Sequence, residues 1–194
     1  ISDDTDAAER VRIQYGTSMC YPISSMGSHV SVVPNHQLNR TTSLHTRANV
    51  AYFGTFGYEL DLNKLTDEEI AEVKAQITFM KEYRELIQFG NFYRLKSPFD
   101  GNETVWMTVS EDKRKALVFW YRERNVVNAE FTRVRLQGLN PDLIYKNEYN
   151  GTENYGDELM NLGLLTTDVT AGEPTNEDLP CTDYESRIYV LTAE

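Results

Sequence analysis

The period of the hydrophobic residues changes near residue 91, and this change constrains the fold more than any other feature of the sequence. Before it, apolar side chains recur mainly at the spacing of an amphipathic helix, whereas after it they alternate in short runs typical of β-strands. A chain of 194 residues is long enough for one large domain or two small ones. We therefore predict an α+β chain in two parts, residues 1–90 and 91–194.

The clearest predicted element of the first part is a helix over residues 67–89. Thr66 and Glu69 have the spacing of a capping box at its start, and Gly90 follows where a C-terminal cap belongs. Apolar residues recur at helical spacing within it, namely Ile70, Val73, Ile77, Met80, Tyr83 and Ile87.

Two more helices are predicted upstream of that one. The first covers residues 6–15 and begins in a cluster of cap-forming side chains, where Asp6 and Glu9 have capping-box spacing. The second covers residues 44–56 after Ser43, and it is apolar on nearly every side, which predicts burial between layers. A short strand and a polar loop are predicted between them, at residues 28–33 and 34–42.

A helical part that supplies only one short strand cannot complete a layered α/β core by itself. The chain also begins with Ile rather than Met, and its opening residues, Ile1-Ser2-Asp3-Asp4, resemble the middle of a longer sequence. We therefore expect an upstream segment that these residues do not include.

The second part is predicted to be a set of short strands separated by turn residues. Strands of this kind, with no helix between them, imply antiparallel pairing and a β-sandwich. A long loop or a mobile tail is expected over residues 166–182, which hold two prolines and few hydrophobic residues. The predicted strands are residues 104–109, 116–121, 131–136, 143–149 and 188–192.

Composition and charge restrict the classes of partner. A hydrophobic content of 40% is that of a globular protein. The net charge of −11 disfavours nucleic acid and anionic membranes as partners, and no apolar run approaches the ~20 residues that span a bilayer. Cys20 and Cys181 stand in no context that resembles a disulfide framework, so two free thiols are predicted.

The sequence contains no glycine-rich phosphate loop, no paired-cysteine zinc pattern and no serine-centred nucleophile elbow. Its histidines, His29, His36 and His45, are too widely spaced for a helical metal pair. They are predicted to be hydrogen-bonded loop residues rather than ligands. We expect no metal and no cofactor.

The remaining candidate for chemistry is the polar cluster at residues 2–6. Its spacing alone favours capping of the helix that follows, because carboxylates accept hydrogen bonds from the free N–H groups of a helix start. The alternative is that one carboxylate faces a substrate at the strand-to-helix edge of a barrel, where catalytic residues collect. Both can hold, since five cap-type residues exceed what one helix start requires.

Residues 2–10 (Ser-Asp-Asp-Thr-Asp-Ala-Ala-Glu-Arg) and 13–18 (Ile-Gln-Tyr-Gly-Thr-Ser) resemble a segment of bacterial α-galactosidases of glycoside hydrolase family 36. The resemblance covers about residues 1 to 165 and consists of several separate blocks in the same order. The further blocks are residues 26–31, 33–37, 56–61, 83–90, 92–95 and 155–160.

This resemblance implies that residues 1–90 are the C-terminal portion of a (β/α)8 catalytic barrel and that residues 91–194 are a C-terminal antiparallel β-sandwich. It also implies that Asp3 is the catalytic acid/base, while Asp4 is either a substrate-binding residue or a cap. Retaining glycosidases use two carboxyl groups ~5 Å apart. The family's nucleophile lies in a Lys-Trp-Asp-type motif, which this sequence lacks, so the chain alone is expected to be inactive.

The function implied by the resemblance is the hydrolysis of terminal α-galactosides, of the melibiose and raffinose type, by double displacement. It further implies α-galactoside oligosaccharides as partners, a cytoplasmic location and a homo-oligomer, a tetramer, when the protein is intact. The alternative from another class is a non-catalytic β-sandwich module with a helical preface, which binds carbohydrate or holds subunits together.

Overall fold

The computed structural model of the chain describes residues 3–126, 131–166 and 183–193. The chain divides into two compact units, residues 1–90 and 91–194, and each is described by itself. Among the described residues, no helix combines the length and the apolar character needed to cross a bilayer.

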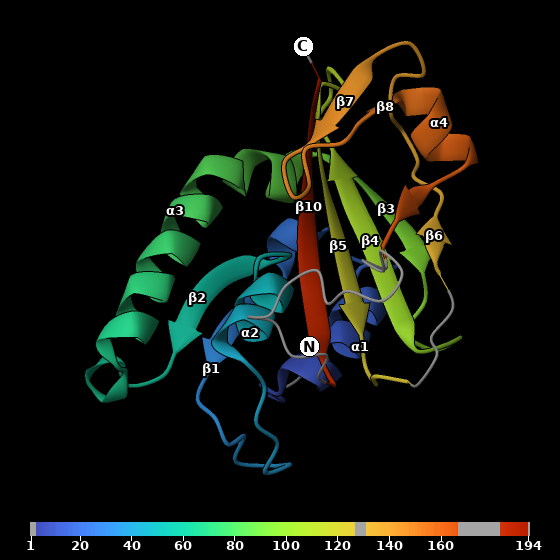
Figure 1. Cartoon of the computed structure of the whole chain (residues 1–194). Coiled ribbons are helices and arrows are strands. Elements are labelled where there is room, and N and C mark those ends of the chain that lie inside the picture. Colours follow the sequence, from blue (N-terminus) through green and yellow to red (C-terminus); the bar gives the residue numbers. More distant parts are fainter. Residues whose placement is uncertain (1–2, 127–130, 167–182, 194) are drawn as a thin grey trace. The chain divides into compact units, whose positions relative to one another are not determined.

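The first unit contains a parallel β-α-β arrangement. Strand β1 pairs in parallel with β2, and helix α2 connects them (Figure 1). The strand predicted over residues 28–33 is confirmed in β1, one residue earlier and two residues shorter at its end. The elements in order are α1 (Ala7–Thr17), η1 (Ile23–Ser25), β1 (Gly27–Ser31), α2 (Leu44–Ala51), β2 (Thr55–Glu59), η2 (Leu62–Lys64) and α3 (Asp67–Phe89).

The prediction of one helix over residues 44–56, and hence of a single strand in this part, is wrong. Helix α2 ends at Ala51, and β2 begins at Thr55, whose N–H donates a 2.7 Å hydrogen bond to the carbonyl oxygen of Met26. A Cβ on Gly54 would lie 2.8 Å from that same oxygen. Only glycine lets the backbone pass so close to the start of β1, and the turn at this point ends the helix.

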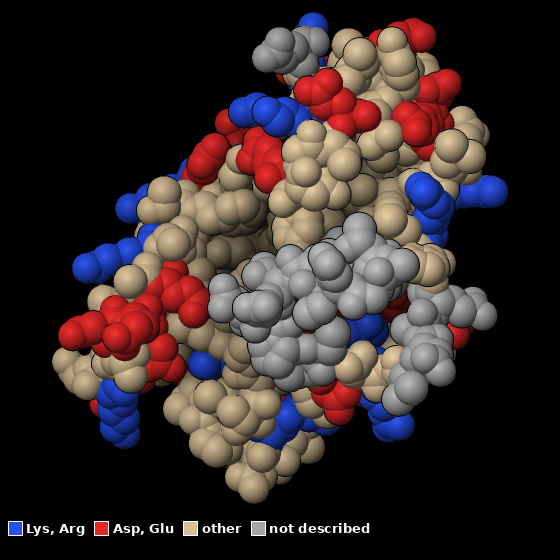
Figure 2. Space-filling view, viewed as in Figure 1, with Lys and Arg blue, Asp and Glu red and all other residues tan. Residues whose placement is uncertain are grey.

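Helix α3 begins and ends where the sequence predicted. The hydroxyl of Thr66 accepts a hydrogen bond from the N–H of Glu69, and the Glu69 carboxylate accepts one from the N–H of Thr66, which completes the capping box. Gly90 is the C-cap residue. Carboxylates and cations both lie along α3 in Figure 2, as expected for a helix with one face in water.

The two-stranded sheet of this unit has two different faces, because successive side chains of a strand alternate. On one face, the Ser28 hydroxyl donates a 2.8 Å hydrogen bond to the buried Gln14 of α1. On the same face, the Tyr58 hydroxyl donates to the Gln76 side chain of α3 at 2.9 Å. Helices therefore cover this face, and the opposite face carries Gly27 and His29.

The second unit is built on an antiparallel sheet, which confirms the predicted pairing. Six strands follow one another in the order β3-β4-β5-β10-β7-β8, and β6 and β9 form a separate two-stranded sheet. The elements are β3 (Asn91–Lys96), β4 (Glu103–Val109), β5 (Lys115–Arg122), β6 (Arg133–Val134), β7 (Ile144–Asn147), β8 (Glu153–Tyr155), α4 (Gly156–Asn161), β9 (Leu164–Leu165) and β10 (Glu185–Ala193).

Three details of this unit differ from the prediction. Helix α4 interrupts the strands. It was not predicted, because six residues are too few to show a helical period in the sequence. Strand β3 was not predicted, and of residues 131–136 only Arg133–Val134 pair as a strand. Most of the predicted loop over residues 166–182 lies outside the described residues, while Thr166 is buried.

Candidate functional site

A cavity of about 480 Å³ lies against the first unit's sheet, on the face that the helices leave uncovered. It is lined by residues from five segments: the residues before α1, α1 itself, β1, the loop after β1, and β2. Polar and charged residues predominate in its wall, which consists of Asp3, Asp4, Thr5, Arg10, Gly27, His29, Ser31, His36 and Glu59.

The strands reach the cavity through every second residue. Gly27, His29 and Ser31 of β1 line it, and the register pairs His29 with Gly57 and Ser31 with Glu59. Nδ1 of His29 lies 3.7 Å from Oε2 of Glu59. The carboxyl end of each parallel strand therefore delivers a polar side chain to the cavity, as in α/β barrels.

The start of α1 is capped by Asp6 rather than by the residues before it. Oδ1 of Asp6 accepts hydrogen bonds of 3.1 Å from the N–H groups of both Ala8 and Glu9. The same carboxylate is buried and forms an ion pair with Arg40. The sequence placed Asp6 at the helix start correctly, and capping by Asp6 leaves Asp3 and Asp4 available for another role.

Asp3 is exposed and lies in the cavity wall. Asp4 lines the cavity too, but its Oδ1 also accepts a 2.9 Å hydrogen bond from the N–H of Asp6. Asp4 therefore holds the turn that precedes the cap while its carboxylate faces the cavity. Asp3 is therefore the better candidate for chemistry in the cavity, because Asp4 also holds the turn.

Arg10 brings a positive charge to the same wall. It is 9% exposed, and its Nη2 donates a 2.6 Å hydrogen bond to the carbonyl oxygen of Gly27. Burial lowers the pKa of the Arg10 guanidinium, and the negative charge of Asp4 partly opposes that shift. The guanidinium thus offsets the negative charge that Asp4 places in the cavity wall.

The prediction that the three histidines are loop residues is wrong for two of them. His29 lies on β1, and His45 lies on α2, where its Nε2 is 2.9 Å from Nδ2 of Asn49. His36 lies in the loop, and with His29 it lines the cavity. Sequence reasoning missed His29, although the alternation of β1 carried the signal.

No group of three or more His, Cys, Asp or Glu residues suited to a metal ion occurs in the part of the chain that the structure describes. Cys20 is a free, exposed cysteine, while Cys181 lies outside the described residues.

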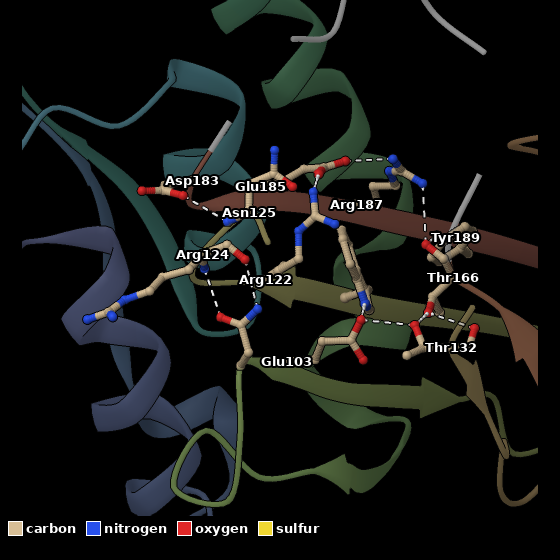
Figure 3. A network of polar contacts seen from close by, with 12 residues as sticks. Glu103, Arg122, Arg124, Asn125, Thr132, Thr166, Asp183, Glu185, Arg187 and Tyr189 are labelled. Atoms are coloured by element: carbon tan, nitrogen blue, oxygen red, sulfur yellow. Dashed lines mark hydrogen bonds and ion pairs between the residues drawn. The ribbon is translucent and has the colours of Figure 1, made fainter. Parts of the chain in front are cut away.

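A second cavity, of about 540 Å³, lies in the second unit, but Glu103 and Arg122 in its wall are held by neighbouring side chains (Figure 3). The Glu103 carboxylate accepts hydrogen bonds from Nε1 of Trp120 at 3.2 Å and from the Thr132 hydroxyl at 3.0 Å. Arg122 pairs with Glu185 at 2.5 Å. This network links strands of the sheet, so we regard it as structural and place the candidate site in the first unit.

Two family models match two different parts of the chain. The family model described as Melibiase matches residues 1–90, and the model of the glycosyl hydrolase family 36 C-terminal domain matches residues 103–191. Both describe parts of glycoside hydrolases. The chain belongs to family 36 of that class.

Individual relatives are similar over most of the chain. The chain is 53% identical over 163 residues to α-galactosidase AgaA of Geobacillus stearothermophilus, a match that covers 84% of this chain and 22% of AgaA. Solved structures of AgaA variants, one with raffinose and one with stachyose, align over 100% of this chain and 25% of theirs. Their TM-scores are 0.89 and 0.90, each at 47% identity. The chain thus spans about a fifth of the length of the curated relative.

Proposed function

We propose that the chain is the end of the catalytic (β/α)8 barrel and the C-terminal β-sandwich of a retaining α-galactosidase. Its substrates would be terminal α-galactosides of the melibiose and raffinose type. The match of residues 1–90 to the Melibiase model supports the activity, and the raffinose and stachyose bound by the AgaA variants support the substrate class.

The fold is compatible with this assignment. Two parallel strands with a connecting helix are a repeating unit of a barrel, and a barrel closes only when further strands complete the sheet. In the second unit, the six-stranded sheet would be one layer of the sandwich, and β6 with β9 would belong to the other. On this proposal the boundary between the domains falls at residues 90 and 91.

Asp3 would act as the acid/base of a double displacement. In the first step, a carboxylate outside this chain attacks the anomeric carbon while protonated Asp3 gives its proton to the glycosidic oxygen. The leaving sugar departs as an alcohol, and galactose stays bound as an ester. In the second step, the Asp3 carboxylate takes a proton from water, whose oxygen attacks the anomeric carbon and releases the enzyme carboxylate. The position of Asp3 in the cavity wall, with Asp6 as the helix cap, is the observation that carries this role.

The test is the Asp3→Asn variant of the longest natural polypeptide that contains the chain. Raffinose has a poor leaving group and needs the proton, so its hydrolysis should fall by roughly 10²- to 10⁴-fold. The first step with a nitrophenyl α-galactoside should be nearly unchanged, because nitrophenolate leaves unprotonated. Asp67→Asn, at an exposed position of α3, is the matched control and should change neither rate.

Equal losses on the two substrates would refute the acid/base role. The same polypeptide also tests the remaining proposals. Light scattering should give the mass of a homotetramer, and fractionation of the source cells should recover the protein in the cytoplasm.

A further inference from the structure

His29 lies in the wall of the cavity, where Gly57 makes room for its ring and Glu59 lies beside it. His29 stands at the middle of β1, on the face that the helices leave uncovered, and it lines the cavity. An imidazole in the cavity that Asp3 also lines can contact a ligand that Asp3 contacts.

Gly57 leaves room for the His29 ring, whereas a side chain at Gly27 would only be in ordinary contact with it. A Cβ added to Gly57 of β2 would lie 2.9 Å from Cδ2 of His29 and 3.5 Å from its Nε2. A Cβ added to Gly27 would lie 3.9 Å from Cε1. The imidazole therefore lies next to Gly57 of β2, in the space that a side chain at residue 57 would take.

Glu59 orients the ring. Its Oε2 lies 3.7 Å from Nδ1 of His29, which is too long for a direct hydrogen bond but close enough for a modest electrostatic preference. The carboxylate favours the tautomer with its proton on Nδ1. In the neutral ring, Nε2 then keeps its lone pair and is an acceptor. A sugar hydroxyl is a donor that suits this acceptor.

We infer that His29 is a substrate-binding residue, whose Nε2 accepts a hydrogen bond from a hydroxyl of the sugar that is held beside Asp3. The inference rests on the proposed α-galactosidase function and extends it to a residue that the acid/base chemistry does not use. The hydroxyl belongs either to the galactosyl unit or to the leaving sugar, and the experiment distinguishes the two.

The experiment compares His29→Ala, Gly57→Ala and the double variant in the longest natural polypeptide that contains the chain. Loss of one hydrogen bond should lower kcat/KM about three- to tenfold, mainly through KM. Gly57→Ala keeps the imidazole but displaces it, so it should reproduce most of that loss. Because both changes act through one contact, the double variant should be no worse than His29→Ala.

His45→Ala is the matched control, since His45 is an exposed histidine of the same unit that does not line the cavity. It should leave kcat/KM unchanged. Galactose inhibition identifies the hydroxyl. If His29→Ala weakens inhibition by galactose as much as it raises the KM for raffinose, the contact is to the galactosyl unit. If only raffinose is affected, the contact is to the leaving sugar.

Two results would overturn the inference. One is an unchanged KM for both raffinose and a nitrophenyl α-galactoside in His29→Ala while the parent enzyme is active, which leaves the proposed function intact. The other is strictly additive losses in the double variant, which would show that Gly57 and His29 act separately. A parent polypeptide that neither binds nor cleaves any α-galactoside would instead refute the proposed function itself.

Discussion

Nη2 of Arg10 donates a 2.6 Å hydrogen bond to the carbonyl oxygen of Gly27, which joins helix α1 to the first residue of β1. Arg10 is buried, so this bond forms where water competes little for either group. This hydrogen bond holds the cavity residues before α1 and the cavity residues of β1 in a fixed relative position. The distance between Asp4 and β1 therefore depends on the bond.

Replacing Arg10 with Leu should destabilise the chain by about 2–3 kcal/mol. The change leaves the Gly27 carbonyl without its donor and removes the charge that faces Asp4. Urea denaturation followed by far-ultraviolet circular dichroism measures the free energy of unfolding. Arg12→Leu is the control. Arg12 sits 4.0 Å from Glu9 as a partly exposed pair, so its loss should be at most about 0.5 kcal/mol. Equal losses would show that the Gly27 bond contributes nothing.

Replacing Gln14 with an apolar residue should destabilise the chain more than replacing Arg10 does. Its Nε2 donates to the carbonyl oxygens of Val50 at 2.9 Å and Phe53 at 3.2 Å, and its Oε1 accepts from Ser28. Gln14→Leu leaves these buried groups unsatisfied, at about 1–3 kcal/mol each before relaxation. We expect a total of about 3–5 kcal/mol, or no soluble folded chain. Gln37→Leu, in an exposed loop position, should cost little, and similar losses in both would contradict this role.

Local sequence signals sufficed for some elements and not for others. The capping box of α3 needs only Thr66 and Glu69, so its start could be read directly. Strand β2 is different, because its identity depends on pairing with β1, and the apolar residues around Gly54 fit a buried helix equally well. The local pattern of these residues is compatible with a helix or a strand, and the pairing with β1 makes them a strand.

In the candidate site too, local sequence signals predicted some features, whereas others depend on non-local pairing. The polar cluster before α1 was visible in the sequence, and the spacing of Asp6 and Glu9 indicated the cap, but the sequence could not say whether Asp3 and Asp4 face a cavity. The structure confirms Asp6 as the cap and places Asp3 in the cavity wall. His29 and Glu59 join the site only because two strands lie in register, a relationship that exists in the fold and has no local motif.

Thr66→Ala should destabilise the chain by about 1 kcal/mol, because the Glu69 N–H loses the hydroxyl that caps it. The matched control lies on the same helix. The Thr78 hydroxyl donates to the carbonyl oxygen of Lys74, which an intact helix does not require, so Thr78→Ala should be neutral or slightly stabilising. Thermal unfolding followed by circular dichroism compares the two, and an equal loss in both would mean that the cap is redundant.

Tyr58 should make the chain less stable at alkaline pH. Burial and the negative charge of Glu72 raise the pKa of Tyr58 to about 12, compared with about 10 in an unfolded chain. Between these values the unfolded state releases the proton and the folded state keeps it. The free energy of unfolding therefore falls as the pH rises from about 10 to about 12.

The Tyr58→Phe variant isolates this contribution. Near neutral pH it should be less stable by about 1 kcal/mol, because the hydroxyl's bond to Gln76 is lost. Its stability should then fall less steeply than that of the parent above pH of about 10. Tyr21→Phe, at a residue that is 62% exposed, should keep the parent's slope. Parallel curves for Tyr58→Phe and the parent would contradict the assignment.

The 194-residue chain by itself should show no α-galactosidase turnover. A retaining mechanism needs a nucleophile ~5 Å from the acid/base, and the family resemblance assigns that nucleophile to a Lys-Trp-Asp-type motif absent from this sequence. The assay is release of nitrophenolate from a nitrophenyl α-galactoside, with Asp3→Asn in parallel as a check for contaminating enzyme. Turnover that requires Asp3 would mean that a carboxylate within the chain serves as nucleophile, and Glu59, in the same cavity, would be the first to test. On the proposed function, adding a separate polypeptide that carries the nucleophile motif should restore activity only if the two parts assemble around Asp3.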